Sequence, residues 1–207
     1  MSTPTQTRPD PAAGSRHSDA TRERILRAAA EVLANQGYAR SHLGEIAAAA
    51  GLKAPAIYHY FPSREALIAA VLREGQVRVR AHVVKAVQDL PPRATARTKV
   101  EAVVAAHLNV QLELSYFALA VVRTLAHVPP EVRALVQPEV ESYHDVWRGL
   151  LNEAVADGEL RPGVDPSMAR MFAVGSLNWA AEWRDDTIPV AQIVENATQM
   201  IVRALFD

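Results

Sequence analysis

The segment from residue 45 to residue 67, EIAAAAGLKAPAIYHYFPSREAL, constrains the fold more than any other part of the chain. Its pattern predicts a short helix, a turn at Gly51, a second short helix, and a third helix that opens at Ser63. Glycine suits the left-handed conformation that ends a helix, and the alanines before it allow two helices to cross closely. The second helix has few apolar positions and carries the run YHY at its end. It is therefore a candidate for insertion into the major groove of DNA.

The rest of the chain has the composition and the periodicity of packed helices. Hydrophobic residues make up 49% of the sequence and aromatic residues only 6%, and no stretch shows the alternation typical of a strand. We expect a kink or break at Pro138, because proline removes a helical hydrogen bond. The expected helices cover residues 19–35, 42–50, 54–60, 63–87, 95–114, 115–127, 130–157, 165–184 and 189–206. We therefore predict an all-α protein of about nine helices.

The composition also limits the cellular setting and the partners. The absence of cysteine excludes disulfides and thiolate metal sites, and we predict no metal and no cofactor. No apolar run approaches the ~20 residues of a membrane span, so we expect a cytoplasmic protein with no membrane partner. The net charge is −1, but residues 1–90 hold 12 Lys/Arg and 8 Asp/Glu, whereas residues 91–207 hold 10 and 15. The positive excess thus lies in the half with the helix-turn-helix, as attraction to DNA phosphates requires.

Residues 21–67 resemble the TetR/AcrR family of bacterial transcriptional regulators. The motifs that carry the resemblance are Gly37-Tyr38, Ile46-Ala47, Ala50-Gly51, Ile57-Tyr58, Tyr60-Phe61 and Ser63-Arg64-Glu65, all in register. The resemblance implies a three-helix DNA-binding domain that is joined through a long fourth helix to a helical domain for effector binding and dimerisation. We expect a disordered tail over residues 1–18, the DNA-binding domain over 19–66, and the second domain over 67–207.

The resemblance also assigns DNA contacts by position. It places Ala54, Pro55, Ala56 and His59 at the base edges. It places Lys53, Tyr58, Tyr60 and Arg64 on phosphates, together with Thr21 and His42 at helix N-termini. We expect the ring of Tyr58 to be buried, with its hydroxyl on a phosphate. Because alanine and proline offer only apolar contact to thymine methyls, specificity is expected to rest on His59, those methyls and DNA shape.

Two apolar stripes near the C-terminus indicate a helix pair built for association, and the family resemblance implies that this pair forms a four-helix interface with a second copy of the chain. The predicted interface residues are Met168, Phe172, Gly175, Trp179 and Trp183 on one helix, and Ile193, Ala197, Ile201, Ala204 and Leu205 on the next. The alternative is that both stripes only close the core of the monomer.

Polar residues scattered among the apolar helices of the C-terminal half are candidates for an effector pocket. They are His107, Gln111, Tyr116, Arg123, His127, Tyr143, Trp147 and Asn178. The segment from Trp147 through GELRPGVDP to LNWAAEW resembles the C-terminal domains of TetR-family members that sense acyl-CoA thioesters. A small hydrophobic effector, an acyl-CoA or a related carboxylate, is therefore the leading ligand class.

The resulting hypothesis is a homodimeric repressor that binds a palindromic double-stranded DNA operator and is released by its effector. One alternative is a helical enzyme that binds an acyl substrate, although no nucleophile elbow, phosphate loop or HExxH motif is present. A second alternative is a DNA-binding protein without an effector, which the absence of a cavity in the C-terminal half would favour.

Overall fold

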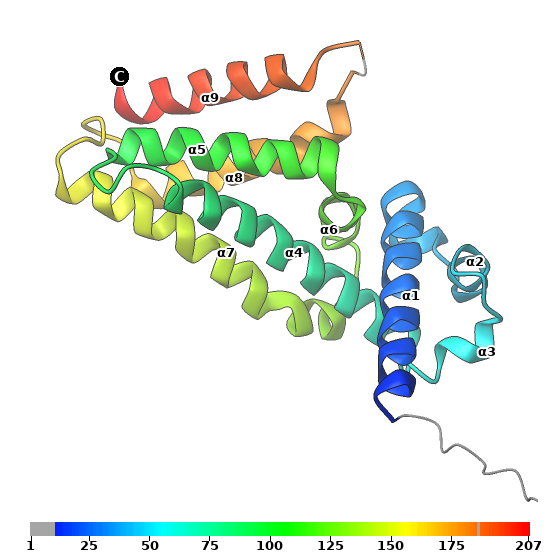
Figure 1. The fold of residues 1–207 in the computed structure, drawn as a ribbon. Helices are drawn as coiled ribbons and strands as arrows, with labels where there is room; N and C mark the ends of the chain where they lie inside the picture. The colour runs from blue at the N-terminus through cyan, green and yellow to red at the C-terminus, as the bar shows by residue number, and fades with distance from the viewer. Residues whose placement is uncertain (1–10, 186) are drawn as a thin grey trace, which may run out of the picture.

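The computed structural model describes residues 11–185 and 187–207, and within them the chain forms nine α-helices, one π-helix and no strand. The elements are α1 (Pro11–Arg40), α2 (Leu43–Ala49), α3 (Ala54–Ile57), α4 (Arg64–Gln88), α5 (Ala96–Asn109), the π-helix η1 (Val110–Leu114), α6 (Tyr116–Thr124), α7 (Pro130–Ala156), α8 (Pro166–Trp183) and α9 (Val190–Phe206). The prediction of an all-α fold with about nine helices is confirmed. Figure 1 shows α1, α2 and α3 grouped at one end, with α4 running from them into the bundle of the remaining helices.

The first helix begins earlier than the sequence predicted. It starts at Pro11, so residues 11–18, which were expected in a disordered tail, are helical, and residues 1–10 lie outside the described residues. Proline is well suited to the first position of a helix because its missing N–H is not needed there, and alanines follow it. The helical run breaks at Gly37, where φ is 72° and ψ is −178°, before it continues to Arg40.

Three other helices differ from their expected extents. The α-helical part of α3 ends at Ile57, and the chain continues to Tyr60 through tighter i→i+3 bonds such as Tyr60 N–H to the Ile57 carbonyl. The fifth helix changes to π-helical geometry at Val110. Helix α7 passes through Pro138 as one continuous helix, so the chain has no break there.

Side-chain caps fix the starts of the longer helices. The Ser63 hydroxyl accepts a hydrogen bond from the Ala66 N–H at 3.0 Å, which opens α4 at the predicted residue. The Asp165 carboxylate accepts one from the Met168 N–H at 2.7 Å at the start of α8. Each cap satisfies a backbone donor that the helix leaves free, which is worth about 1 kcal/mol.

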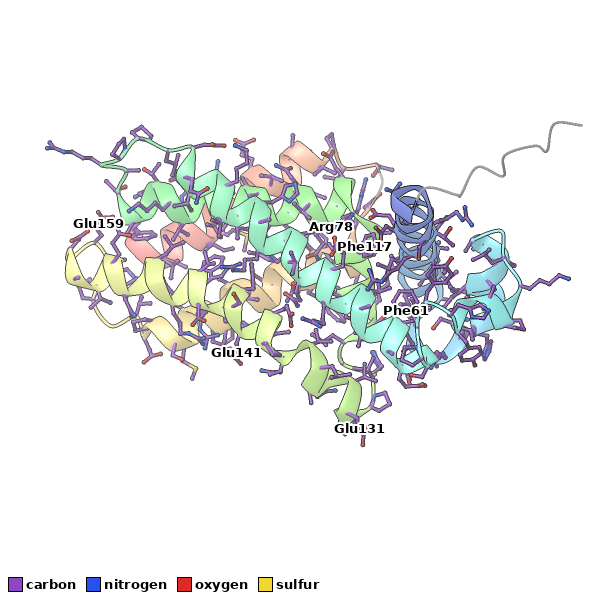
Figure 2. The ribbon with its side chains drawn as sticks, turned by 60° about the horizontal axis from the view of Figure 1, so that its bottom comes forward. Phe61, Arg78, Phe117, Glu131, Glu141 and Glu159 are labelled. Carbon is purple, nitrogen blue, oxygen red and sulfur yellow. The ribbon has the colours of Figure 1, made fainter. Side chains whose placement is uncertain are left out.

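The buried side chains form two clusters. The N-terminal core joins α1, α2, α3 and the first half of α4 to α6 and the start of α7, through residues such as Leu33, Ile46, Leu67 and Phe117. The C-terminal core contains the second half of α4 with α5, α7, α8 and α9, including Trp147 and Leu177. Helix α6 therefore shares a core with the helix-turn-helix and also lies beside the bundle (Figure 1). Figure 2 labels Phe61 and Phe117, which both belong to the N-terminal core.

Among the described residues, no single helix is long and apolar enough to cross a bilayer; one pair, Ala96–Glu113 with Tyr116–Thr124, reaches that length and composition only together and is bent by 93°.

Candidate DNA-binding surface and effector pocket

Helix α3 lies on the outer side of the N-terminal group (Figure 1), and most of the predicted DNA-contacting residues lie on it or directly beside it in the chain. Buried Ile57 and Phe61 hold it against the N-terminal core. The side chains of His42, Lys53, Pro55, Tyr58 and His59 are exposed, and those of Ala54, Ala56 and Tyr60 are partly exposed. Tyr58 is 56% exposed, so the expectation that its ring is buried is wrong. An exposed ring leaves both its face and its hydroxyl available to a DNA backbone.

Thr21 does not occupy the expected position. It was assigned to a phosphate from a helix N-terminus, but α1 starts at Pro11 and Thr21 lies inside the helix with 5% of its surface exposed. The structure does not support a phosphate contact there, because the longer helix places this side chain in the interior.

Arg64 was also assigned to a phosphate, but its guanidinium is used within the domain. Its Nε donates to the Ser41 carbonyl at 2.9 Å, and its Nη2 donates to the Tyr38 carbonyl at 2.5 Å and to the Ser41 hydroxyl at 3.2 Å. Its Cζ also lies 4.5 Å from the centre of the Tyr38 ring. Arg64 thereby attaches the first residue of α4 to the end of α1 and to the loop that leads into α2.

The C-terminal half contains a cavity of about 340 Å³ between α4, α5, η1, α6, α7 and α8. Four predicted pocket residues line it, namely His107, Gln111, Tyr143 and Asn178. Most of the remaining wall is apolar, with valines from α4, α6, α7 and α8. The volume lies near the lower end of the range for small-molecule sites.

The polar side chains of the cavity form one continuous series of hydrogen bonds. The contacts at one end of the series determine which group donates and which accepts in each bond. The Gln111 Nε2 group donates to the carbonyls of Leu177 at 3.2 Å and Asn178 at 2.7 Å, both on α8. Its Oε1 must therefore accept the 2.8 Å bond from His107 Nε2. That assignment leaves His107 Nδ1 as the acceptor of the 2.6 Å bond from the Tyr143 hydroxyl.

This series of hydrogen bonds ends at Trp147, whose indole Nε1–H donates to the Tyr143 hydroxyl oxygen at 2.9 Å. Every side-chain polar hydrogen in the series from Trp147 to Gln111 then has an acceptor, either within the series or on the backbone of α8. The buried polar wall of the cavity is internally satisfied, and it rigidly connects α7, α5 and α8.

Burial also keeps this wall uncharged. Desolvation lowers the pKa of His107 to about 4, against the smaller opposing effect of its hydrogen bond with Gln111. Desolvation raises the pKa of the Tyr143 hydroxyl, against the opposing hydrogen bond from Trp147. At neutral pH both groups are neutral, so this end of the cavity offers no positive charge to an anion.

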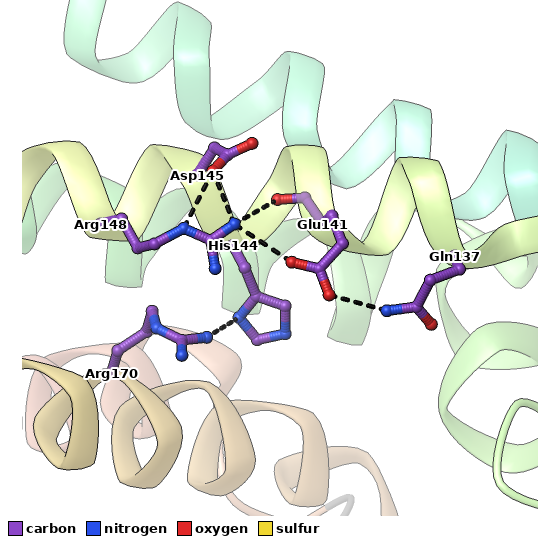
Figure 3. Close-up of polar contacts among 6 residues, drawn as sticks. All are labelled: Gln137, Glu141, His144, Asp145, Arg148 and Arg170. Carbon is purple, nitrogen blue, oxygen red and sulfur yellow. Dashed lines mark hydrogen bonds and ion pairs between the residues drawn. The ribbon is translucent and has the colours of Figure 1, made fainter.

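A cluster of polar and charged side chains on α7 and α8 lies next to the cavity, and two of its members, Gln137 and His144, line the cavity (Figure 3). His144 lines the cavity, and its Nδ1 accepts a hydrogen bond from Arg170 on α8 at 2.7 Å. The pKa of His144 is lowered mainly by burial and, to a smaller extent, by the positive charge of Arg170. Arg148 is bonded to Asp145 at 2.6 Å and to Glu141 at 3.1 Å along α7, and its hydrogen bond lowers the pKa of Glu141.

The sequence prediction missed three rim residues on α7, namely Arg133, Gln137 and His144. With Val140 they are spaced by four, three and four residues, which is the repeat of one helical face. That spacing was available in the sequence, but it does not by itself show which face borders a cavity.

The other four predicted pocket residues lie elsewhere. Trp147 is fully buried behind Tyr143, and Tyr116 is exposed. Arg123 and His127 line a separate cleft between the end of α1, α6 and α8.

Helix α8 exposes a row of large apolar side chains, among them Met168, Phe172, Trp179 and Trp183, and Gly175 lies in the same exposed row. Apolar grooves of about 420 and 480 Å³ follow it along α9. On α9, Ala204 is exposed, Ala197 and Ile201 are partly buried, and Met200 adds an exposed apolar side chain. Ile193 and Leu205 were predicted at the interface but are buried in the C-terminal core, because that side of α9 packs on α5.

Two family models match the chain. The one described as bacterial regulatory proteins, tetR family, matches residues 25–71, and the one described as tetracyclin repressor-like, C-terminal domain, matches residues 93–205, more than half of the chain. The chain belongs to the TetR family. The resemblance on which the helix-turn-helix assignment rests is thereby confirmed.

Curated TetR-family relatives carry regulatory names. The fatty acid metabolism regulator protein of Bacillus subtilis (strain 168) is 27% identical over 154 residues, covering 74% of this chain and 78% of the relative. The HTH-type transcriptional repressor LfrR of Mycolicibacterium smegmatis is 30% identical over 176 residues, covering 84% of this chain and 85% of the relative.

Solved TetR-family structures share the fold. The crystal structure of AibR in complex with isovaleryl coenzyme A and operator DNA matches with a TM-score of 0.79 and 23% identity over 90% of this chain and 100% of that one. The structure of the transcriptional regulator FadR from Bacillus subtilis in complex with stearoyl-CoA matches with a TM-score of 0.75 and 23% identity, covering 88% and 98%.

Proposed function

We propose that this TetR-family chain is a cytoplasmic repressor that binds a palindromic operator as a homodimer and leaves it when an acyl thioester fills the cavity. The observation that carries the proposal is an apolar cavity with an uncharged, internally satisfied polar wall, located in the same chain as an exposed α3. Its relatives are named as regulators, and two structures of similar fold hold acyl-CoA thioesters.

The electrostatics of the cavity select a thioester over a free acid. A carboxylate against the neutral His107 and Tyr143 would be buried without a partner, which costs several kcal/mol. An acyl chain linked as a thioester brings no charge into the cavity and leaves its charged carrier outside. The rim offers Arg133 and Gln137, both exposed, to that carrier. The modest volume favours a short or medium acyl chain.

On the DNA side, α3 supplies apolar contact from Ala54, Pro55 and Ala56, and polar contact from His59. The exposed Lys53, Tyr58 and His42 are the phosphate ligands of the proposal, with partly exposed Tyr60 beside them. A dimer would place two copies of α3 in successive major grooves ~34 Å apart.

The homodimer is supported by the exposed row on α8. Soluble proteins rarely expose so many large apolar side chains on one helix, and the apolar grooves beside α9 extend this surface.

The two alternatives receive less support. A DNA-binding protein without an effector is disfavoured by the cavity itself. An acyl-substrate enzyme is not proposed, since the relatives are named as regulators; turnover of an acyl-CoA by the purified protein would revive it.

The test begins with selection of a duplex from a random library by the purified full chain. Mobility shifts are then measured with isovaleryl-CoA, octanoyl-CoA, stearoyl-CoA and the matching free acids. We expect at least one thioester to weaken operator binding by ~100-fold, which corresponds to ~2.7 kcal/mol of coupling, and its free acid to have a much smaller effect. Release by the acids and not by the thioesters would overturn the ligand assignment. Operator affinity that does not change with salt would overturn the phosphate contacts.

A further inference from the structure

Arg123 joins the two halves of the molecule. It lies on α6, where its Nη1 donates to the Ala34 carbonyl of α1 at 2.6 Å and its Nε donates to Glu182 Oε1 of α8 at 3.0 Å. About one third of its side chain is exposed, so water partly screens the ion pair. One guanidinium thereby contacts a helix of the DNA-binding domain and a helix of the bundle at the same time.

The α6 and α8 ends of this bridge are also walls of the effector cavity. Val122, next to Arg123, lines the cavity from α6, and Asn178, one turn before Glu182, lines it from α8. Gln111 holds the backbone of that turn through the carbonyls of Leu177 and Asn178. The two helices that Arg123 and Glu182 join are therefore also two walls of the cavity.

The α1 end of the bridge controls the orientation of the helix-turn-helix. Ala34 is fully buried and lies in the last turn before the break at Gly37. A Cβ on Gly37 would lie 3.9 Å from the Arg123 carbonyl, so the backbones of α1 and α6 approach closely there. The segment that follows carries Tyr38, at the end of α1, and Ser41, in the loop before α2, and Arg64 attaches α4 to both. A shift of this turn moves the loop and α2 with it.

We propose that Arg123 is the positioning residue that couples the cavity to the DNA-binding domain. An effector that changes the α6–α8 separation displaces Glu182 relative to α6, and Arg123 transmits this displacement to the last turn of α1. Only the identity of the effector rests on the proposed function. The coupling itself is testable without any ligand.

The first experiment measures hydrogen exchange of the backbone in residues 31–40 of the full chain, free of DNA and ligand. Glu182→Gln weakens the ion pair on α8 and touches no atom of α1. We expect it to raise exchange at the end of α1 by about fivefold, the effect of losing about 1 kcal/mol, and Arg123→Gln to raise it further. Arg148→Gln is the matched control, because its hydrogen bonds stay within α7, and it should leave this segment unchanged.

An increase with Arg123→Gln but none with Glu182→Gln would overturn the proposal, because Arg123 would then be a local cap of α1. No increase with either variant would overturn it as well. Arg123→Lys keeps the charge but lacks the fork that donates in two directions, so it should retain folding stability and still show the faster exchange.

The second experiment compares operator affinity with and without the thioester that acts on the wild-type chain. We expect the ~100-fold release to fall to about tenfold in Glu182→Gln, with thioester affinity unchanged on DNA-free protein. An unchanged release would overturn the coupling. If no thioester acts on the wild type, the proposed function fails and the hydrogen-exchange result still decides the role of Arg123.

Discussion

The Tyr143 hydroxyl on α7 lies 2.6 Å from Nδ1 of His107 on α5, and this hydrogen bond joins the two helices at the wall of the cavity. Gln111 requires a proton on His107 Nε2, and burial, which lowers the pKa of His107 to about 4, keeps the ring neutral at pH 7. The bond therefore sets the chemistry that the cavity offers to a ligand and ties the stability of the bundle to pH.

Acid should destabilise the protein through His107. Its folded pKa of about 4 lies below the ordinary value of 6.5, so the unfolded state binds more protons between these values. The contribution of the neutral imidazole is complete above pH 6.5 and is lost as pH falls toward 4, for a total of about 3 kcal/mol. Urea unfolding across this range should show the loss, and His107→Asn should flatten it. If the free energy of unfolding depended on pH equally in the wild-type and His107→Asn proteins, the low pKa of His107 would be contradicted.

Tyr143→Phe should destabilise the bundle at neutral pH. The change leaves His107 Nδ1 and the Trp147 N–H without partners in a buried site, at a cost of about 1–3 kcal/mol each. Tyr116→Phe, at an exposed tyrosine, is the control and should be close to neutral. Chemical unfolding measures both, and equal effects of the two changes would rule out the polar chain as a source of stability.

Substitutions at Arg64 and Lys53 should distinguish an effect on folding stability from an effect on DNA binding. Arg64→Ala removes three hydrogen bonds, one to the end of α1 and two to Ser41 in the loop before α2, and should lower the free energy of unfolding by about 1–3 kcal/mol. Lys53→Ala, at an exposed residue, should leave stability unchanged and reduce the salt slope of operator binding by about one per subunit. Thermal unfolding measures the stability of both variants, and a salt series measures their operator affinity. A Lys53→Ala protein with the wild-type dependence of log affinity on log salt would exclude the phosphate contact.

Gly75→Ala should disturb the contact between α4 and α6. A Cβ there would overlap the Phe117 carbonyl and the Val121 side chain, and overpacking of this kind costs about 1–3 kcal/mol. Gly149→Ala on α7 meets nothing within 4 Å and should be neutral or stabilising by up to about 1 kcal/mol. Calorimetry of the two variants distinguishes them, and a stabilised Gly75→Ala protein would show that the two helices separate freely.

Phe172→Asp should dissociate the dimer. Phe172 is 76% exposed at the middle of the α8 row, and an unpaired charge at an interface raises the dissociation constant by ~100-fold or more. Leu135→Asp, at an exposed leucine on α7, should leave the dimer intact. Native mass spectrometry at several concentrations measures both; a dimer that survives Phe172→Asp would move the interface to another face.

Local signals in the sequence were enough to place the helices and the helix-turn-helix. The start predicted at Ser63 agrees with α4 because a cap acts within one turn, and the turn predicted at Gly51 is present because this glycine adopts a positive φ. The start of α1 was the exception, since no cap stops the helix at residue 19 and it extends to Pro11.

The sequence by itself determined which segments are helical and which family the chain belongs to, because caps, glycines and apolar periodicity act over a few residues. Only the tertiary structure decided the function of each polar side chain on those helices. Periodicity assigned Arg123 and His107 to similar apolar helices, but packing placed one at the junction with α1 and the other against the cavity. How deeply a side chain is buried and which groups it contacts depend on how helices far apart in the sequence approach one another. The apolar repeat within a single helix gives no information about that approach.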